Sequence, residues 1–365
     1  MMKSIVLALA VAWSAGAAEP APRTLQPAPL SLNGPLGHVT AVAELADGRL
    51  LVSDIRTPRV TLVEPTGALR PLGTAGAGEL QYAQPGGFYR GPAGTTILLD
   101  RAGPKALVIS PTGEFVRGYS VAEKGVQRSS DSERDWMRLD QRGLAYFERL
   151  AFAPGTTTKD LIRMDPGTQH KDIVAKLALP ETRSISGGDG MTFSRSVIGS
   201  PADDWAVAPD GRVAVIRAKP YRVDWVSANG TITQGPEIAF DAIPFTDADK
   251  QAAEARSRAR GGMSVGVSRN GQQASAADLA IRFADTKPPF FPDEAMISPT
   301  GQVWVKRAMP FGSATVVYDV FDGTGARINR FSFPALSAIV GFGARAVYLR
   351  IGEGANETLA RYRLP

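Results

Sequence analysis

Basic side chains recur in two connections in the second half of the chain, where they could bind an anion. One connection spans residues 217–222 and the other begins at residues 306–307, and neither of these stretches contains an acidic residue. Cationic groups that face the same way concentrate anionic ligands through their local field, and an aromatic ring adds a stacking surface. We therefore predict a ligand site made of Arg217, Lys219, Tyr221, Arg222, Lys306 and Arg307.

Few residues suit metal binding or covalent catalysis. The chain has no Cys and only two His, His38 and His170, which are far apart and outside any ligand spacing. A Ser-His-Asp set cannot be assembled from these two histidines, which both lie in expected loops. The acids between residues 131 and 140 alternate with arginines, Arg138 among them, which favours a solvated loop over a calcium site. The sequence thus predicts no catalytic set, no metal site and no cofactor.

A repeated strand-turn-strand unit must position these residues. Gly48 and Gly67 are 19 residues apart, and the same spacing separates Gly94 from Gly113 and Gly211 from Gly230. Apolar runs lie between the turns, as expected for the strands of a propeller blade. Six first turns and five second turns can be counted, with Gly at positions that favour positive φ. The first turns end at Gly48, Gly94, Gly143, Gly211, Gly301 and Gly343, and the second at Gly67, Gly113, Gly167, Gly230 and Gly325.

The last unit ends after its third strand, at residues 359–364, and leaves an unpaired edge. Residues 24–32 are the natural partner, so we expect an all-β, six-bladed propeller closed by an N-terminal strand. The longest interruption, residues 241–287 between the fourth and fifth units, predicts a helix over 248–260 that begins with a capping box of Thr246 and Asp249. A solvated surface helix is favoured over a lid across the channel.

Residues 1–18 have the pattern of a secretory signal peptide: Lys3, an apolar run from Ile5 to Trp13, and small residues before a cut near Ala17 or Ala18. This predicts a periplasmic or extracellular protein with no transmembrane segment after cleavage, and a single domain over residues 19–365. Composition is ordinary, with 44% hydrophobic and 21% charged residues and a net charge of +5. We expect a monomer that binds a protein or a small anion and no nucleic acid.

Residues 54–60 (DIRTPRV), followed by Thr66-Gly67, resemble an NHL-type repeat. In that family an Asp ends the second strand and an Arg opens the third. Residues 100–105 repeat the pattern with Lys in place of Arg, whereas the fourth and fifth units have Arg217 and Lys306 at the Asp position. The resemblance covers nearly the whole chain after residue 18 and implies a secreted six-bladed propeller, without indicating a reaction.

Two functions remain open from the sequence. The first is a non-catalytic binding module that uses the basic connections on one face of the ring. The alternative is a metal-dependent lactonase- or lyase-like enzyme with its site at the central channel. Related propeller enzymes hold a divalent metal such as calcium on Glu, Asn and Asp at the channel mouth. Those ligands have no clear counterparts here, so the sequence favours the binding module.

Overall fold

The structure is a computed structural model, and it describes residues 19, 21–124, 137–150, 155–186, 192–259 and 281–365. The expected signal peptide lies outside the described residues, as does most of the acidic stretch between 131 and 140. No helix in the described part of the chain is long and apolar enough to cross a membrane.

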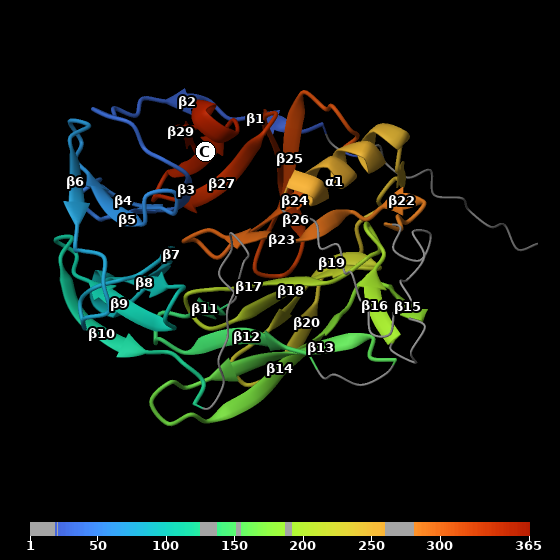
Figure 1. The fold of residues 1–365 in the computed structure, drawn as a ribbon, viewed down its shortest axis with the longest axis horizontal. Helices are drawn as coiled ribbons and strands as arrows, with labels where there is room; N and C mark the ends of the chain where they lie inside the picture. The colour runs from blue at the N-terminus through green and yellow to red at the C-terminus, as the bar shows by residue number, and fades with distance from the viewer. Residues whose placement is uncertain (1–18, 20, 125–136, 151–154, 187–191, 260–280) are drawn as a thin grey trace, which may run out of the picture.

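The chain is all-β with one α-helix, and its strands follow one another in antiparallel runs, most of them four strands long. Figure 1 shows these runs arranged in chain order around a common centre, which is the arrangement of a β-propeller. The first three runs are β3 (Val39–Glu44), β4 (Leu50–Asp54), β5 (Arg59–Val63) and β6 (Leu69–Leu72); β7 (Pro85–Arg90), β8 (Thr96–Asp100), β9 (Lys105–Ile109) and β10 (Phe115–Ser120); β11 (Met137–Leu139), β12 (Ala145–Arg149), β13 (Thr158–Met164) and β14 (Lys171–Ala178).

The second half continues in the same way. Its runs are β17 (Asp204–Val207), β18 (Val213–Ala218), β19 (Tyr221–Val226) and β20 (Ile232–Gln234); β23 (Phe290–Ile297), β24 (Val303–Arg307), β25 (Thr315–Phe321) and β26 (Arg327–Pro334); β27 (Ser337–Phe342), β28 (Ala346–Ile351) and β29 (Thr358–Arg363). Middle strands such as β4, β8 and β18 carry runs of buried apolar residues, because sheets pack against both of their faces.

The expectation of six separate sheets is not met. Strand pairing among the described residues gives five sheets of four or more strands, and the largest has eight. That sheet joins the run β27–β29 to the run β3–β6, because β27 and β3 pair in parallel at Gly341–Val42 and Phe342–Ala43. Gly341 permits this approach, since a Cβ there would lie 2.0 Å from the carbonyl oxygen of Val42. The first and last runs therefore meet directly at the ring closure.

The N-terminal segment completes the last run, as predicted. Within residues 24–32, β2 (Pro27–Ala28) pairs antiparallel with β29, so that Pro27 faces Tyr362. Just before it, β1 (Arg23–Thr24) adds a parallel edge to β26. In Figure 1 both blue strands lie beside the red end of the chain. The pairing with β2 covers the edge of β29, which the sequence predicted to need a partner.

The predicted helix is present as α1 (Asp247–Ala259), between β21 (Ile243–Pro244) and β22 (Thr286–Lys287). Its capping box is formed: the Thr246 N–H donates to Asp249 (2.9 Å) and the Asp249 N–H to the Thr246 hydroxyl (3.3 Å). Asp249 also bonds the Lys287 ammonium at 2.6 Å, and both side chains are buried. The helix start is therefore anchored to the propeller. The remaining hairpin, β15 (Thr182–Ser186) and β16 (Thr192–Ser196), lies before β17.

The repeated glycines mostly serve the turns as expected. Gly48 and Gly94, for example, have φ of 86° and 76°. Two expectations are wrong. Gly167 does not take positive φ, because Gln169 does so instead (63°) in a wider turn. Gly343 is also not among the positive-φ glycines, and it is needed for space, since a Cβ there would lie 1.9 Å from a carboxylate oxygen of Glu44.

The repeated Asp of the NHL-like pattern holds the backbone together. Asp54 is fully buried and accepts hydrogen bonds from the Gly37 N–H (2.8 Å) and the His38 N–H (3.0 Å) at the entrance of β3. Asp100 does the same at the entrance of β7, bonding the N–H groups of Ala83 and Gln84 at 2.9 Å. Burial alone would raise the pKa of Asp54, but these bonds and those from Thr57 lower it. The motif is structural.

Candidate functional site

The predicted basic residues lie at one end of the ring, which we call the loop end because the connections between second and third strands lie there. Arg217 bonds Asp203 (2.7 Å) and Asp224 (3.1 Å), and Arg222 bonds the other oxygen of Asp224 at 2.8 Å. The connection itself contains no acid, but Asp203 lies directly before β17 and Asp224 lies within β19. The premise that nothing neutralises these cations is therefore wrong.

The same holds for the second basic connection. Arg307 bonds Asp319 of β25 at 2.8 Å, and Asp319 also accepts the hydroxyl hydrogen of Tyr221 at 2.9 Å. Arg307 and Tyr221 are buried, and burial together with the charge of Asp319 raises the pKa of Tyr221 well above its ordinary value. Lys306 lies 3.7 Å from Glu294. Of the six predicted residues, Lys219 alone is exposed with no interaction to the described residues.

The main cavity lies at the opposite end of the ring, which we call the turn end because the first hairpin turns lie there. It measures about 970 Å³, within the range typical of ligand pockets. Its walls come from the carboxyl-terminal parts of the six first strands, β3, β7, β11, β17, β23 and β27, and from the turns that follow them. We call it the central cavity. None of the six predicted residues lines it.

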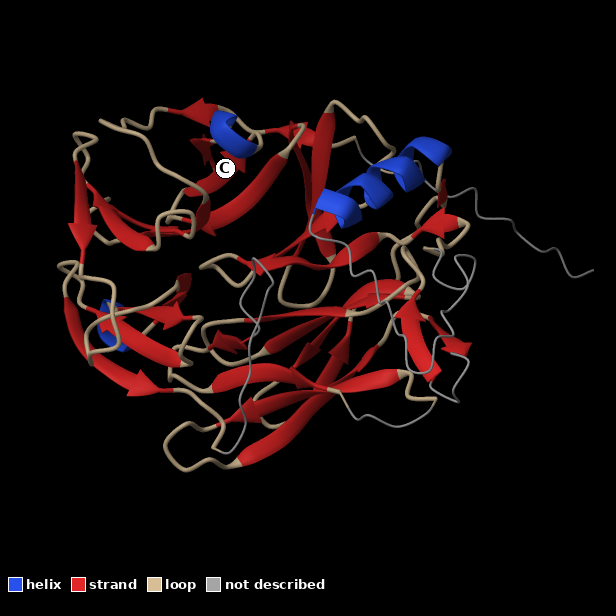
Figure 2. Ribbon diagram, in the orientation of Figure 1, coloured by secondary structure: helices blue, strands red, loops and turns tan. Residues whose placement is uncertain are grey.

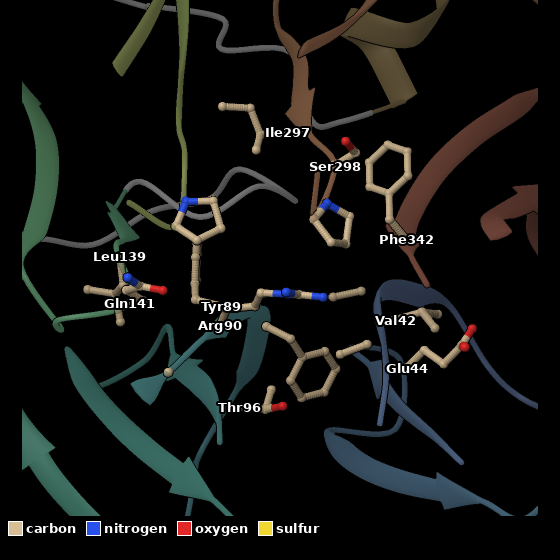
Figure 3. A pocket seen from close by; sticks show the side chains of 18 of the residues that line it. Val42, Glu44, Tyr89, Arg90, Thr96, Leu139, Gln141, Ile297, Ser298 and Phe342 are labelled. Atoms are coloured by element: carbon tan, nitrogen blue, oxygen red, sulfur yellow. The ribbon is translucent and has the colours of Figure 1, made fainter. Parts of the chain in front are cut away.

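Slightly more than half of the cavity wall is apolar. Figure 3 shows Val42 from β3, Leu139 from β11, Ile297 from β23 and Phe342 from β27 around the space. Four charged side chains interrupt this surface: three arginines and one glutamate, namely Arg90, Arg138, Arg142 and Glu44. Charged groups on an apolar wall interact more strongly than in water, because fewer water molecules screen them.

Glu44 is the one acidic residue among the described residues that line the cavity. The Tyr348 hydroxyl, on β28, donates to its Oε2 at 2.6 Å, and Arg361 lies 3.9 Å from the same oxygen. No described residue bonds Oε1. Burial, with the hydrogen bond and the charge of Glu44, raises the pKa of Tyr348, so the tyrosine remains a proton donor at neutral pH. The pair holds one carboxylate oxygen and leaves the other to accept a proton.

Arg138 lies over an aromatic ring. Its guanidinium carbon lies 4.3 Å from the centre of the Trp205 ring, and its side chain is 14% exposed. Its nearest acid, Asp204, is 4.0 Å away and already accepts backbone N–H groups of β17 and β23. Arg138 makes no hydrogen bond to the described residues, and its Nη1 is buried without a partner. The sequence analysis wrongly placed this residue in a solvated loop; it belongs to the short strand β11.

Arg90 ends β7 and is exposed. No described residue forms a hydrogen bond, ion pair or ring contact with it. Figure 3 places it near the middle of the view, between the residues of β11 and β3. Arg142, by contrast, is bound to Asp140 at 2.8 Å and 3.1 Å. The cavity therefore contains two guanidinium groups with unused donors, Arg90 and Arg138.

The acidic residues present do not fit the divalent metal that the enzyme alternative requires. No group of three or more His, Cys, Asp or Glu side chains occurs among the described residues at ligand distance. Glu44 lies on the cavity wall with three arginines, and a cation would be repelled by them. We therefore derive no step through a metal.

The sequence contains one signal for this cavity. Glu44, Arg90 and Arg138 all lie on the first strand of a unit, next to its hairpin turn. First strands line a propeller's axis, so charged residues near their ends face the channel or its mouth. The predicted basic residues lie in or beside the connections between second and third strands, which are at the opposite end of the ring.

Neither a family model nor a curated protein matches the sequence. Solved structures do resemble it. They include a gluconolactonase from Xanthomonas campestris (12% identity, TM-score 0.43, covering 90% of this chain and 87% of that chain) and virginiamycin B lyase from Staphylococcus aureus (9%, 0.41, 94% and 99%). Another is an aldose sugar dehydrogenase from Streptomyces coelicolor (11%, 0.43, 94% and 99%). These similarities are distant and give no information about a substrate of this chain.

The expectation of a non-catalytic binding module on the basic face is corrected by the contacts at the loop end. Acids pair with four of the six residues on which it was based, namely Arg217, Arg222, Lys306 and Arg307. The fifth, Tyr221, already donates its hydroxyl hydrogen to Asp319.

Proposed function

We propose that this chain is a lactonase- or lyase-like enzyme whose active site is the central cavity. One observation carries the proposal. The single carboxylate on the cavity wall, Glu44, is held through one oxygen by Tyr348, and it shares the cavity with arginines that have unused donors. A proton acceptor and positive charge in one apolar cavity are the elements of acid–base catalysis.

The two reaction classes use the same first step. A lactonase removes a proton from the water that attacks the ester carbonyl, whereas a lyase removes one from the carbon beside an electron-withdrawing group. Either step builds negative charge on an oxygen of the substrate. In this proposal Glu44 accepts the proton through Oε1, and the Arg90 guanidinium stabilises the developing charge. In the lactonase the ring C–O bond then breaks, and in the lyase the bond to the leaving group breaks as the double bond forms. In both, Glu44 returns the proton to the departing group, so the carboxylate is regenerated. Tyr348 keeps the carboxylate in place.

The experiment is a turnover assay on the purified full chain. A panel of lactones is followed with a pH indicator, and a panel of carboxylic acids with a leaving group two carbons away is followed by absorbance of the new double bond. Glu44→Gln is expected to lower turnover by about 10²- to 10⁴-fold, since a positioned acid–base group contributes that much. Glu114→Gln, an exposed glutamate in a hairpin turn, is the matched control.

Two results would refute the proposal: no turnover on either panel, or equal loss in the two variants. Because the described acids do not form a metal site, activity is expected to persist after dialysis against EDTA. Loss of activity on dialysis with recovery on adding calcium would instead support the metal-dependent enzyme.

Three finer expectations accompany this proposal. We infer that the ring has six blades, and the six first strands that contribute to one cavity support this count, with the eight-stranded sheet taken as two blades. We also propose a cleaved leader at residues 1–18 and a periplasmic or extracellular location, supported by the sequence pattern. Finally, we propose that the protein is a monomer with a small-molecule partner. Mass photometry of the secreted protein tests the monomeric state.

A further inference from the structure

We infer that the ligand of the central cavity is a small organic molecule with a single negative charge, a monocarboxylate, whose anionic group binds Arg138 and Arg90. The inference rests on the proposed function only for the location of the site, and it adds the class of substrate. Its basis is the unused hydrogen-bonding capacity of the cavity.

Arg138 is arranged to bind an anion. The cation–π contact with Trp205 uses none of the guanidinium N–H groups. Nη1 is enclosed and has no partner, so an anion would reach the guanidinium through the exposed 14% of the side chain. Asp204 does not fill the role, because its oxygens accept backbone N–H groups and remain 4.0 Å away.

Other donors lie along the same wall. Thr40 on β3 has a buried hydroxyl oxygen without a partner among the described residues. Arg90 is unpaired, as described above. Two of the nine buried side-chain polar atoms without a partner among the described residues, from β3 and β11, belong to residues of this cavity, which also holds the cation of Arg90. Together with the exposed part of Arg138, these residues favour a ligand that supplies acceptors.

The charge balance favours one negative charge over two. The wall carries Arg90, Arg138, Arg142 and Glu44. The charged neighbours bound to them or nearest to them are Asp140, Asp204 and Arg361. Four positive and three negative groups leave about one positive charge. A carboxylate neutralises it, whereas a phosphate dianion would leave an excess charge facing Glu44. The apolar residues around it, Val42, Leu139, Ile297 and Phe342, suit an apolar body.

Binding is tested by isothermal calorimetry with phenylacetate on the full chain, at low ionic strength. Phenylacetamide is the matched neutral probe and phenyl phosphate the dianionic one. Phenylacetate is expected to bind at least tenfold more tightly than either. Arg138→Gln and Arg90→Gln are each expected to weaken phenylacetate about 10- to 100-fold, as for loss of a hydrogen bond between charged groups. Arg70→Gln, an exposed and unpaired arginine on β6, is the control and should bind as the parent does.

The outcomes separate this inference from the proposed function. Equal binding of phenylacetamide, tighter binding of phenyl phosphate, or full binding by Arg138→Gln would overturn the monocarboxylate site. Glu44→Gln should bind phenylacetate at least as tightly as the parent does, because the substitution removes a negative charge from the wall. A protein that binds phenylacetate through Arg138 but shows no turnover would refute only the enzyme. Turnover of neutral lactones with no preference for an anion would refute only this inference.

Discussion

The two ends of the ring use the same residue types for opposite purposes. At the loop end, Arg217 and Arg307 are each bound to buried carboxylates at 2.7–2.8 Å. At the turn end, Arg138 lies over the indole of Trp205 and makes no hydrogen bond to the described residues, and Arg90 has no partner among them. The paired arginines already donate their hydrogen bonds to carboxylates of the fold, whereas the unpaired arginines can still donate to a ligand. Burial and pairing, more than the number of cations, therefore distinguish a structural end from a functional one.

The largest expected effect comes from breaking a buried pair at the loop end. Asp319 is fully buried and bonds Arg307, Tyr221 and Arg330. Asp319→Asn leaves the Arg307 charge without its main partner, which typically costs about 3–5 kcal/mol. The lower value is expected, because Glu19 lies 3.5 Å from Arg307 and offsets part of the loss.

Urea unfolding of the parent and the variant at pH 7 measures this difference. Asp247→Asn is the control, since Asp247 is 91% exposed in its pair with Lys250, and the expected change is below about 0.5 kcal/mol. Equal changes in the free energy of unfolding for the two substitutions would show that burial does not determine how much a charged pair stabilises this protein.

The sequence predicted the all-β propeller arrangement, though not the five sheets of four or more strands, because this arrangement depends on local signals. Turn glycines and apolar runs identified the strands, and a capping box identified the start of α1. Partners of charged residues are not local. Arg217 is neutralised by Asp203, 14 residues earlier, and Arg307 by Asp319, 12 residues later, through strand pairing. The cavity was difficult to predict for the same reason, since Glu44, Arg90 and Arg138 come from three different runs of strands and line one cavity only in the closed ring.

A middle-sized effect is expected at Asp54, the structural Asp of the first run. Asp54→Asn removes the charge that accepts N–H groups of Gly37 and His38, and we expect a loss of about 2 kcal/mol at pH 7. The pKa of Asp54 is lowered by folding, so its contribution is present above the unfolded pKa of about 4 and is lost as pH falls through the folded value.

The difference in free energy of unfolding between parent and Asp54→Asn should therefore be constant between pH 7 and pH 5 and shrink below about pH 4. Urea titrations at several pH values measure it. Asp210→Asn, in a 53% exposed pair with Arg212, should cost less than about 1 kcal/mol at pH 7. A difference that grows at acid pH would mean that Asp54 is held protonated in the fold, against the hydrogen-bond pattern described above.

The smallest expected effect tests the comparison most directly. Lys219 is exposed at the loop end and, unlike Arg217 and Arg222 beside it, has no interaction with the described residues. If unpaired cations at the loop end also served a ligand, Lys219→Glu would weaken phenylacetate binding by its reversed charge. We expect no change in that affinity and a stability change within about 0.5 kcal/mol, because an exposed side chain without contacts contributes little to either. A tenfold loss of affinity in the calorimeter would place the anion at the loop end and reverse the assignment of the two ends.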